Sequence, residues 1–406
     1  MYFELAWRNV WRNYRRTLVI IIAVVIGVWS MVFLSAFSRG MINNMLENGK
    51  SVMVGDVQIH KKGYREDPSI EKSIKEPLPI ELLLKKNLPV KAIWTKRIKL
   101  SAFVSNARHS TGLTLVGIDP EQEKHISFIG KSLVQGDYLT KDDSRGIIMG
   151  KALLEKFETG IGKKLIIMTR NEKGEISSKA FKIKGVFKTE LEATEKGFLF
   201  ITIKGARKLT GMKTAISEIS ISGIKNEELE GFTRVLKDGL DSDLYNIETW
   251  KDLLPTLEAY VDMFNSFMYI WYVVVFIAMG FGIVNTSLMA VFERVREFGL
   301  LRALGMKPWW VIRSVLTESF FILLVGVSVG NFLGIASVYL MKFNGLNLAM
   351  FGNGAEFFGM SRIIYPALTL HDFMSIDIII VVLGFIVSLY PAIRAAKITP
   401  VEAMRE

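Results

Sequence analysis

The stretch Met279–Met306, MGFGIVNTSLMAVFERVREFGLLRALGM, joins an apolar segment to a charged one without a break. The apolar segment ends at Phe292, and a short amphipathic helix is predicted directly after it. Leu300, Leu301 and Leu304 lie on one side of that helix, and Gly305 ends it ahead of Pro308. Such a helix either lies on lipid headgroups or docks into a groove of a partner protein.

The apolar part of this stretch belongs to one of four runs without a charged residue. These runs are Thr17–Phe37, Met263–Phe292, Ser319–Met341 and Ile378–Ile393. A helix over the 21 residues of the first run would be roughly 31 Å long, about one hydrocarbon core. The last run has only 16 residues, so it spans a membrane only if Asp377 lies at the level of the headgroups or if its helix begins near Phe373. The alternatives are buried core helices and, for the first run, an uncleaved signal peptide.

The composition agrees with a chain that is divided between lipid and water. Of 406 residues, 50% are hydrophobic and 22% charged, the net charge is +11, and no cysteine is present. This excludes a disordered chain, a collagen-like chain and a disulfide scaffold. The lack of cysteine also excludes thiolate catalysis and zinc sites built from cysteine.

Basic residues in the short connections predict the orientation. Residues 1–16 carry four Arg against one Glu, and residues 293–313 carry five basic residues against two Glu. The connection 342–377 carries two basic and three acidic residues. We therefore expect both termini and the connection 293–313 on the cytoplasmic side of a membrane, and residues 38–262 on the outer side.

The predicted fold class is an α-helical membrane protein with four transmembrane helices and a large α+β extracytoplasmic domain between the first two spans. The predicted segments are a cytoplasmic amphipathic helix (1–16), the first span (17–38), the periplasmic domain (39–262), the second span (263–292), a cytoplasmic coupling helix (293–308), the third span (311–341), a periplasmic loop (342–372), the fourth span (373–393) and a cytoplasmic tail (394–406).

Alternating and apolar runs bounded by glycine predict strands within the periplasmic domain. They are Val52–His60, Leu113–Ile118, Gly146–Met149, Lys164–Thr169, Ala180–Phe187, Phe198–Ile203 and Glu218–Ile224. Helices are predicted at Ala152–Phe157, Gly205–Leu209 and Glu227–Leu240, and Leu82–Lys86 and Val90–Leu100 read as helix then strand. Trp250–Phe267 is predicted as a helix that continues into the second span.

Catalytic motifs are absent from the sequence. No phosphate-binding loop, zinc-protease motif or nucleophile elbow is present. The four histidines, His60, His109, His125 and His371, are scattered, so no metal site is predicted. Glu318 is the acidic residue that lies deepest in a predicted span, and we expect it to face the helix bundle or the cytoplasmic interface.

Several motifs resemble the MacB/FtsX-type (type VII) permeases of ABC transporters. The stretch Met279–Met306 is similar to the family's connection between the second and third spans, and Tyr390–Arg405 is similar to its C-terminal tail. Gln135–Leu139 and Gly150–Leu153 resemble patterns of its periplasmic domain. Gly55–His60, GDVQIH, resembles a segment of the lipoprotein-releasing (Lol) permeases, with Asp56 where His is usual.

The resemblance implies a permease that is not itself an enzyme and that holds no cofactor. ATP and Mg²⁺ would be bound by a separate cytoplasmic ATPase dimer, and a second permease copy or a homologue would complete the transporter. ATP hydrolysis would move the periplasmic domain mechanically. The residues implied in coupling to the ATPase are Glu293, Arg294, Arg296, Glu297, Leu300, Leu301, Arg302, Leu304 and Gly305.

Similarity to the Lol permeases implies that lipoproteins are extracted from the inner membrane and passed to a periplasmic carrier. The acyl chains would lie against the outer halves of the first two spans. The implied lining is Val28, Met31, Val32, Phe33, Phe37, Phe264, Phe267, Met268 and Trp271. Gly326, Gly330 and Gly334 form a row of small residues for close helix packing, either within one chain or between two.

Three other functions remain open at this stage. The first is MacB-like efflux of peptides, antibiotics or siderophores with a periplasmic adaptor. The second is FtsX-like regulation of a cell-wall hydrolase, although the periplasmic segment is larger than such regulators usually carry. The third is a membrane receptor or scaffold without an ATPase. Nucleic-acid binding is disfavoured, because the 37 basic and 31 acidic residues of 38–262 are evenly mixed.

Overall fold

The computed structural model describes residues 7–398 except 9, 190 and 348–362. The chain forms two compact units. One, the helical unit, comprises the chain up to Asn44 and from Tyr260 onward, and the other, the α/β domain, comprises Met45–Ala259. The predictions for residues 1–6 and 399–406 and for residues 348–362 of the loop 342–372 lie outside the described residues.

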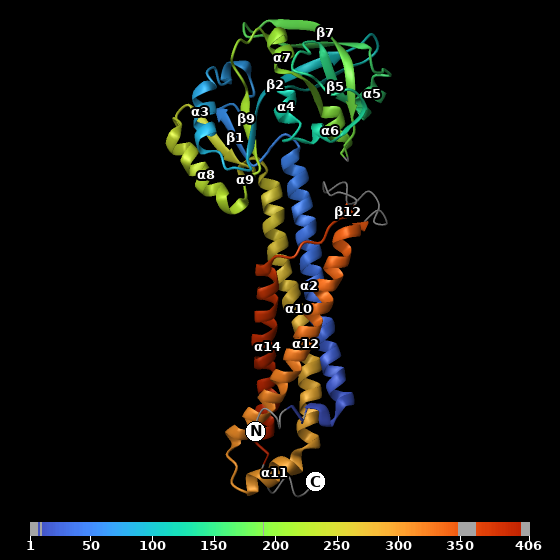
Figure 1. Cartoon of the computed structure of the whole chain (residues 1–406), viewed down its shortest axis with the longest axis vertical. Coiled ribbons are helices and arrows are strands. Elements are labelled where there is room, and N and C mark those ends of the chain that lie inside the picture. Colours follow the sequence, from blue (N-terminus) through green and yellow to red (C-terminus); the bar gives the residue numbers. More distant parts are fainter. Residues whose placement is uncertain (1–6, 9, 190, 348–362, 399–406) are drawn as a thin grey trace. The chain divides into compact units, whose positions relative to one another are not determined.

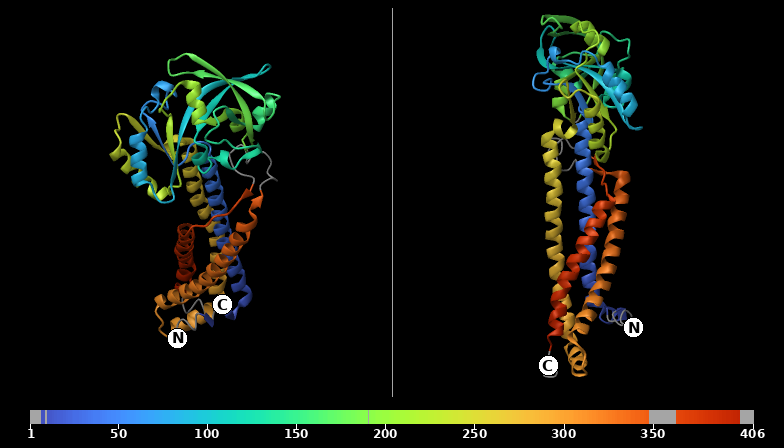
Figure 2. Two further views of the ribbon diagram at one scale, coloured as in Figure 1. Left: turned by 45° about the horizontal axis from the view of Figure 1, so that its top comes forward. Right: turned by 90° about the vertical axis from the view of Figure 1, so that its left-hand side faces the viewer.

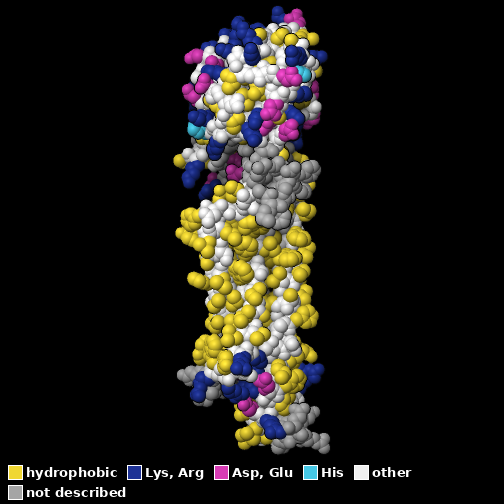
Figure 3. Space-filling view, turned by 90° about the vertical axis from the view of Figure 1, so that its right-hand side faces the viewer, with side chains coloured by type: hydrophobic (Ala, Val, Ile, Leu, Met, Phe, Trp, Pro, Cys, Tyr) yellow, Lys and Arg dark blue, Asp and Glu magenta, His cyan; other side chains and the backbone are white. Residues whose placement is uncertain are grey.

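Four long helices make up the helical unit, and Figures 1 and 2 show them running side by side. They are α2 (Tyr14–Ser51), α10 (Pro255–Glu293), α12 (Pro308–Asn344) and α14 (Leu370–Ala396). Each contains an apolar window long enough to cross a membrane. Hydrophobic side chains cover the surface of these helices, and charged side chains gather at the end that carries the short helix α11 (Val295–Ala303) (Figure 3). The predicted four-span layout is confirmed.

A row of glycines lets α12 approach α2 closely. A Cβ atom on Gly326, Gly330 or Gly334 would lie 2.6–2.7 Å from a Val side chain of α2. The valines are Val24, Val28 and Val32, so both rows repeat every four residues. The glycine row therefore makes a contact within one chain. The sequence alone was equally compatible with a contact between two chains.

The α/β domain is built on a ten-stranded mixed sheet with the order β10-β1-β9-β2-β3-β8-β5-β7-β4. The remaining strand, β6, pairs with both β2 and β7, so β2, β3, β8, β5, β7 and β6 close into a barrel. The pairs β3–β8 and β5–β7 are parallel, and all other pairs are antiparallel. Phe187, Phe200, Ile118 and Ile148 meet in one buried cluster of this barrel.

The strands are β1 (Val57–Lys61), β2 (Ile93–Ser105), β3 (Ser110–Ile118), β4 (Leu133–Gly136), β5 (Gly146–Gly150), β6 (Lys164–Arg170), β7 (Ile176–Phe187), β8 (Phe198–Thr202), β9 (Glu218–Ser222) and β10 (Tyr245–Thr249). The helices are α3 (Leu78–Asn87), α4 (Pro120–Glu123), α5 (Lys151–Lys156), α6 (Glu192–Gly197), α7 (Ile203–Thr210), α8 (Asn226–Gly239) and α9 (Trp250–Leu253), with 3₁₀ turns at Ile70–Lys72 and Phe128–Gly130. The short strands β11 (Leu346–Asn347) and β12 (Ile363–Ile364) pair in the helical unit.

Three predictions in this domain were wrong in part. Val52–Gly55 is not strand, because Met53 and Gly55 take positive φ angles in a turn at the end of α2. The strands β4 and β10 were missed, since both are short and carry polar residues. The helix predicted from Trp250 is interrupted at Leu254, where Pro255 disfavours helical backbone in the residue before it.

Candidate functional site

The exposed apolar surface of the α11 region is formed by three leucines. Leu300 is 63% exposed and Leu304 77% exposed, and Leu301 is also exposed. We call these three residues the leucine patch. On the opposite side of the helix, Val295 and Phe298 are buried against Val291, Val311 and Ala392. One apolar side of the helix therefore packs against its own chain, and a second apolar side is exposed.

Three of the charged residues implied in coupling bind residues of their own chain at the start of α11. Glu293 accepts a hydrogen bond from Arg16 at 2.5 Å, and Glu297 pairs with Arg12 at 2.8 Å. Arg294 pairs with Glu318 at 2.7 Å. These contacts connect the ends of α2, α10 and α12 to α11, so the charges hold the helix in place.

One further contact and one backbone turn define the C-terminal end of α11. Arg302 donates a hydrogen bond to the carbonyl oxygen of Ala396, at the end of α14, at 2.5 Å. Gly305 has a φ angle of +93°, which a residue with a Cβ adopts only with strain. The leucine patch is thus presented from a helix that is held at both ends by α2, α12 and α14.

Glu318 faces the helix bundle at the α11 end, as the sequence analysis expected. Its side chain lies beside Arg294, and both are mostly buried. A small cavity next to them is lined by Thr17, Ser287 and Ser319. Glu318 neutralises the buried guanidinium of Arg294. This ion pair explains why an acidic residue is present in an apolar helix.

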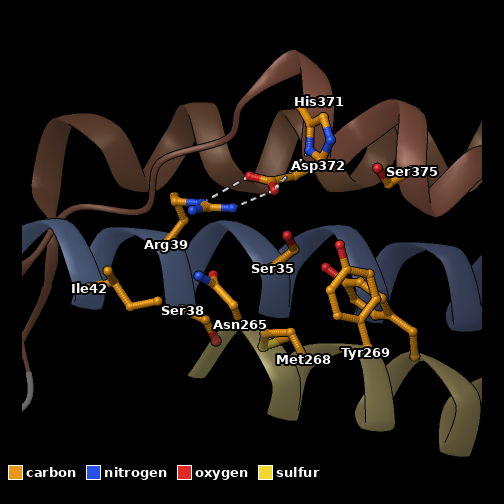
Figure 4. Close-up of a pocket in the computed structure, with 11 residues that line it drawn as sticks. Ser35, Ser38, Arg39, Ile42, Asn265, Met268, Tyr269, His371, Asp372 and Ser375 are labelled. Carbon is orange, nitrogen blue, oxygen red and sulfur yellow. Dashed lines mark hydrogen bonds and ion pairs between the residues drawn. The ribbon is translucent and has the colours of Figure 1, made fainter. Parts of the chain in front are cut away.

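A polar cavity of about 250 Å³ lies between α2, α10 and α14. Figure 4 shows Arg39 of α2 reaching across to Asp372 of α14, with two hydrogen bonds of 2.6 and 3.1 Å. Ser35, Ser38, Asn265 and Tyr269 complete much of the lining. An ion pair among apolar helices is costly unless both charges are satisfied, and here the bidentate contact satisfies them.

The structure divides the residues implied in binding acyl chains into two groups. Val28, Met31 and Val32 are fully buried in the core of the helical unit, where α10 and α12 cover them. These three cannot line a site open to a ligand unless the helices separate. Phe267 and Trp271 of α10 are exposed, whereas Phe33, Phe37, Phe264 and Met268 are half-buried. The predicted acyl-chain site is therefore compatible only with the second group, whose side chains are exposed or half-buried.

Two family descriptions match the chain along most of its length. The description "MacB-like periplasmic core domain" matches residues 17–239, and "FtsX-like permease C-terminal" matches residues 269–400. The chain belongs to the MacB/FtsX-type permeases of ABC transporters. The family expected from the sequence motifs is thereby confirmed, together with the α/β domain between the first two long helices.

Individual relatives of this permease carry two different names. The lipoprotein-releasing system transmembrane protein LolC of Neisseria meningitidis serogroup B is 24% identical over 320 residues, which cover 75% of each chain. The macrolide export ATP-binding/permease protein MacB of Nitrobacter winogradskyi is 33% identical over 126 residues, 31% of this chain and 17% of that protein. The solved periplasmic region of MacB from Actinobacillus actinomycetemcomitans covers 53% of this permease and 97% of that chain, with 18% identity and a TM-score of 0.37.

A cluster of buried charges in the α/β domain was not foreseen from the sequence. Arg97 of β2 is fully buried and pairs with Glu123 at 2.8 Å and with Glu218 at 3.0 Å. Lys99 lies 2.8 Å from the other oxygen of Glu218. The signal that could have indicated this cluster is the alternation of β2, in which Arg97 occupies an inward position.

His60 and Asp56 of the segment GDVQIH belong to the same buried region. Burial alone would lower the pKa of His60, but the carboxylates of Glu218 and Glu248, at 3.5 and 3.4 Å, outweigh it and raise that pKa. Asp56 accepts hydrogen bonds from the backbone N–H groups of Gly223 and Ile224. These contacts give Asp56 a structural role at the position where the Lol resemblance was imperfect.

Among the described residues, no group of three or more His, Asp or Glu is arranged to hold a metal ion.

Proposed function

We propose that this permease couples ATP hydrolysis by a separate cytoplasmic ATPase dimer to the extraction of lipoproteins from the inner membrane. The ATPases would bind ATP and Mg²⁺. A second copy of the chain or a homologue would complete the transporter, and both termini would face the cytoplasm. The similarity to LolC over three quarters of both chains supports lipoprotein release as the transported process.

The leucine patch is the observation that carries the coupling to an ATPase. Three exposed leucines on a helix whose charged residues bind their own chain leave an apolar surface on a rigid support. Apolar residues that project from a helix are suited to a groove in a partner protein. Arg296 and the exposed parts of Glu293 and Glu297 would then border this contact and set its orientation.

The substrate site in this proposal lies on the exposed surface of α10. Phe267 and Trp271 would contact the acyl chains, together with the half-buried Phe264 and Met268. Phe33 and Phe37 of α2 would border the same surface, and a carrier protein would take up the released lipoprotein. The bilayer itself supplies the acyl chains, so an apolar surface that faces lipid needs no entry channel.

The coupling is tested by co-purification of the ATPase with Leu301→Asp/Leu304→Asp. We expect the ATPase to be lost, because a carboxylate buried in an apolar groove costs several kcal/mol, on the order of a hundredfold or more in affinity. Leu82→Asp/Leu244→Asp adds the same charges on exposed leucines of the α/β domain and should retain the ATPase. Unchanged co-purification of the leucine-patch variant would exclude this docking surface.

Lipoprotein release is tested separately in membrane vesicles that contain the permease and its ATPase. ATP should release a radiolabelled lipoprotein to an added carrier protein, and Trp271→Asp should abolish that release while ATP hydrolysis continues. Release of peptide or macrolide instead of lipoprotein would favour the MacB-like alternative.

A further inference from the structure

One pocket of the α/β domain collects positive charge from several elements. It encloses about 600 Å³ and lies beside the end of β3 and the start of α7. Its basic lining residues are Lys96, Lys141, Lys204, Arg207, Lys208 and Lys213, and Asp119 is the one acidic residue in the lining. We call this site the basic pocket.

The helix α7 brings three of these cations together at a cost to its own stability. Lys204, Arg207 and Lys208 are spaced three and four residues apart, so they lie on one face of the helix. No acidic residue is present in its first turn, where the helix dipole disfavours the positive charge of Lys204. A bound anion would relieve both the repulsion between like charges and the unfavourable dipole interaction.

The acidic residues around the basic pocket compensate only part of its charge. Lys96 forms a partly buried ion pair with Glu81 at 2.9 Å. Lys141 pairs with Glu121 and Lys204 with Asp142, but all four side chains are at least half exposed. Exposed pairs of this kind contribute about 1 kcal/mol or less and can exchange for another anion. The carboxylate of Asp119 already accepts a hydrogen bond from the backbone of α4.

Three cations of the basic pocket have even less compensation. Within the described part of the chain, Lys208 and Lys213 form no ion pair. Arg207 donates to the carbonyl oxygen of Thr214, but its buried Nε atom has no hydrogen-bond partner. Burial lowers the pKa of Arg207, and the more distant charge of Glu81 offsets this only in part.

We propose that the basic pocket binds a ligand that carries two or more phosphate groups. Its volume matches sites for small molecules, which measure roughly 300–1,000 Å³, and is too small for a folded protein partner. Lys and Arg side chains from β2, α7 and two loops converge on it, and such groups make strong charge-assisted hydrogen bonds with phosphate oxygens. The phosphate could belong to a lipid headgroup or to a soluble molecule.

The proposal is tested by calorimetry on the full chain in a neutral detergent, with inorganic pyrophosphate as the probe. We expect Lys204→Gln/Lys208→Gln to weaken binding roughly tenfold or more, since each removes a charged contact. Lys85→Gln/Lys86→Gln on α3 removes the same charge from an exposed helix end and should change binding less than about twofold. Lys213→Gln, in a loop, should weaken binding without altering α7.

Thermal melting distinguishes a loss of ligand binding from a folding defect of the variant. Without ligand, Lys204→Gln/Lys208→Gln should melt no lower than the parent chain, because repulsion within α7 is reduced. Pyrophosphate should raise the melting temperature of the parent and not that of this variant. Dihexanoyl phosphatidylinositol 4-phosphate, a soluble lipid with two phosphate groups, distinguishes the sources: tighter binding than pyrophosphate assigns the site to lipid, and weaker binding assigns it to soluble phosphates.

Three results would overturn the proposal. One is that neither pyrophosphate nor dihexanoyl phosphatidylinositol 4-phosphate binds to the parent chain. Another is equal weakening by the α7 variant and the α3 control, which would indicate attraction by overall charge. The third is tighter binding of an oligoglutamate peptide that the α7 variant abolishes, which would assign the basic pocket to an acidic protein segment.

Discussion

At the scale of single residues, His60 is a buried histidine of the α/β domain that lies between two carboxylates. Its ring is almost fully buried and stacks on Tyr64 at 5.4 Å between ring centres. Glu218 and Glu248 face its two nitrogens, and Lys99 and Arg97 contact Glu218 from the neighbouring strand. Burial opposes ionisation of Glu218, but Lys99, His60 and Arg97 lower its pKa well below the usual range. It therefore stays charged beside His60.

The raised pKa of His60 predicts a loss of stability as the pH increases. A group whose pKa is higher in the folded chain stabilises it fully below the unfolded pKa, about 6.5, and loses that contribution as the pH rises through the folded value. The free energy of unfolding of the α/β domain should therefore fall as the pH rises from 6 to alkaline values. His60→Gln should remove this decline, as measured by limited proteolysis of the full chain.

The exposed His125 provides the control for this measurement. His125→Gln should leave the pH dependence as it is in the parent chain. If His60→Gln retained the full decline in stability between pH 6 and 9, the ion pairs of His60 could not be its cause.

At the scale of helices, the contact of α2 with α12 depends on the absence of side chains on one glycine row. A Cβ on Gly330 would lie 2.6 Å from Cβ of Val28 and 3.0 Å from the carbonyl oxygen of Val25. Gly330→Ala should therefore destabilise the helical unit by about 1–3 kcal/mol, as overpacking does in other cores. Melting of the full chain in detergent measures this effect.

Two variants make the test specific to this contact. Val28→Ala should restore only a small part of the stability of Gly330→Ala, because it removes Cγ1 at 2.9 Å but keeps the Cβ of residue 28 at 2.6 Å. Gly282→Ala on α10, where no atom lies within 4 Å of a new Cβ, should be neutral or stabilising. Equal melting temperatures of Gly330→Ala and Gly282→Ala would contradict the close packing.

The sequence predicted the long elements better than the sites. Four apolar runs were sufficient to place α2, α10, α12 and α14, because lipid tolerates no long charged segment in a span. The same signal could not distinguish residues that face lipid from residues that face another helix. Val28 and Val32 therefore read as possible substrate contacts, although glycines of α12 cover them.

The interior of the α/β domain was harder to predict, for a different reason. A buried charge is stable only beside partners that are distant in sequence, and Arg97 meets Glu123 and Glu218 through the sheet. The pairing order that brings these residues together is not contained in local periodicity. The charged residues of the coupling segment also pair with partners that are distant in sequence. Glu293 pairs with Arg16, and Glu297 pairs with Arg12.

At the scale of the whole molecule, α10 is the element that couples chemistry to release in the proposed mechanism. It runs unbroken for 39 residues from Pro255, and the division between the α/β domain and the helical unit falls between Ala259 and Tyr260. The helix break at Leu254 lies before this helix begins, so no break falls within α10. Movement of the α11 end would then be transmitted by a helix rather than by a loop.

Ala259→Gly/Tyr260→Gly should uncouple the two processes. Each glycine weakens a helix interior by roughly 1 kcal/mol, so the double variant would bend where the parent helix stays rigid. With the ATPase bound at the leucine patch, ATP hydrolysis should continue while release of lipoprotein to a carrier is lost. Glu227→Gly/Glu230→Gly in α8, a helix confined to the α/β domain, gives a comparable loss of helix propensity and should leave release intact. Full release by the α10 variant would mean that motion reaches the α/β domain by another route. The other long helix that continues from the helical unit into the α/β domain is α2.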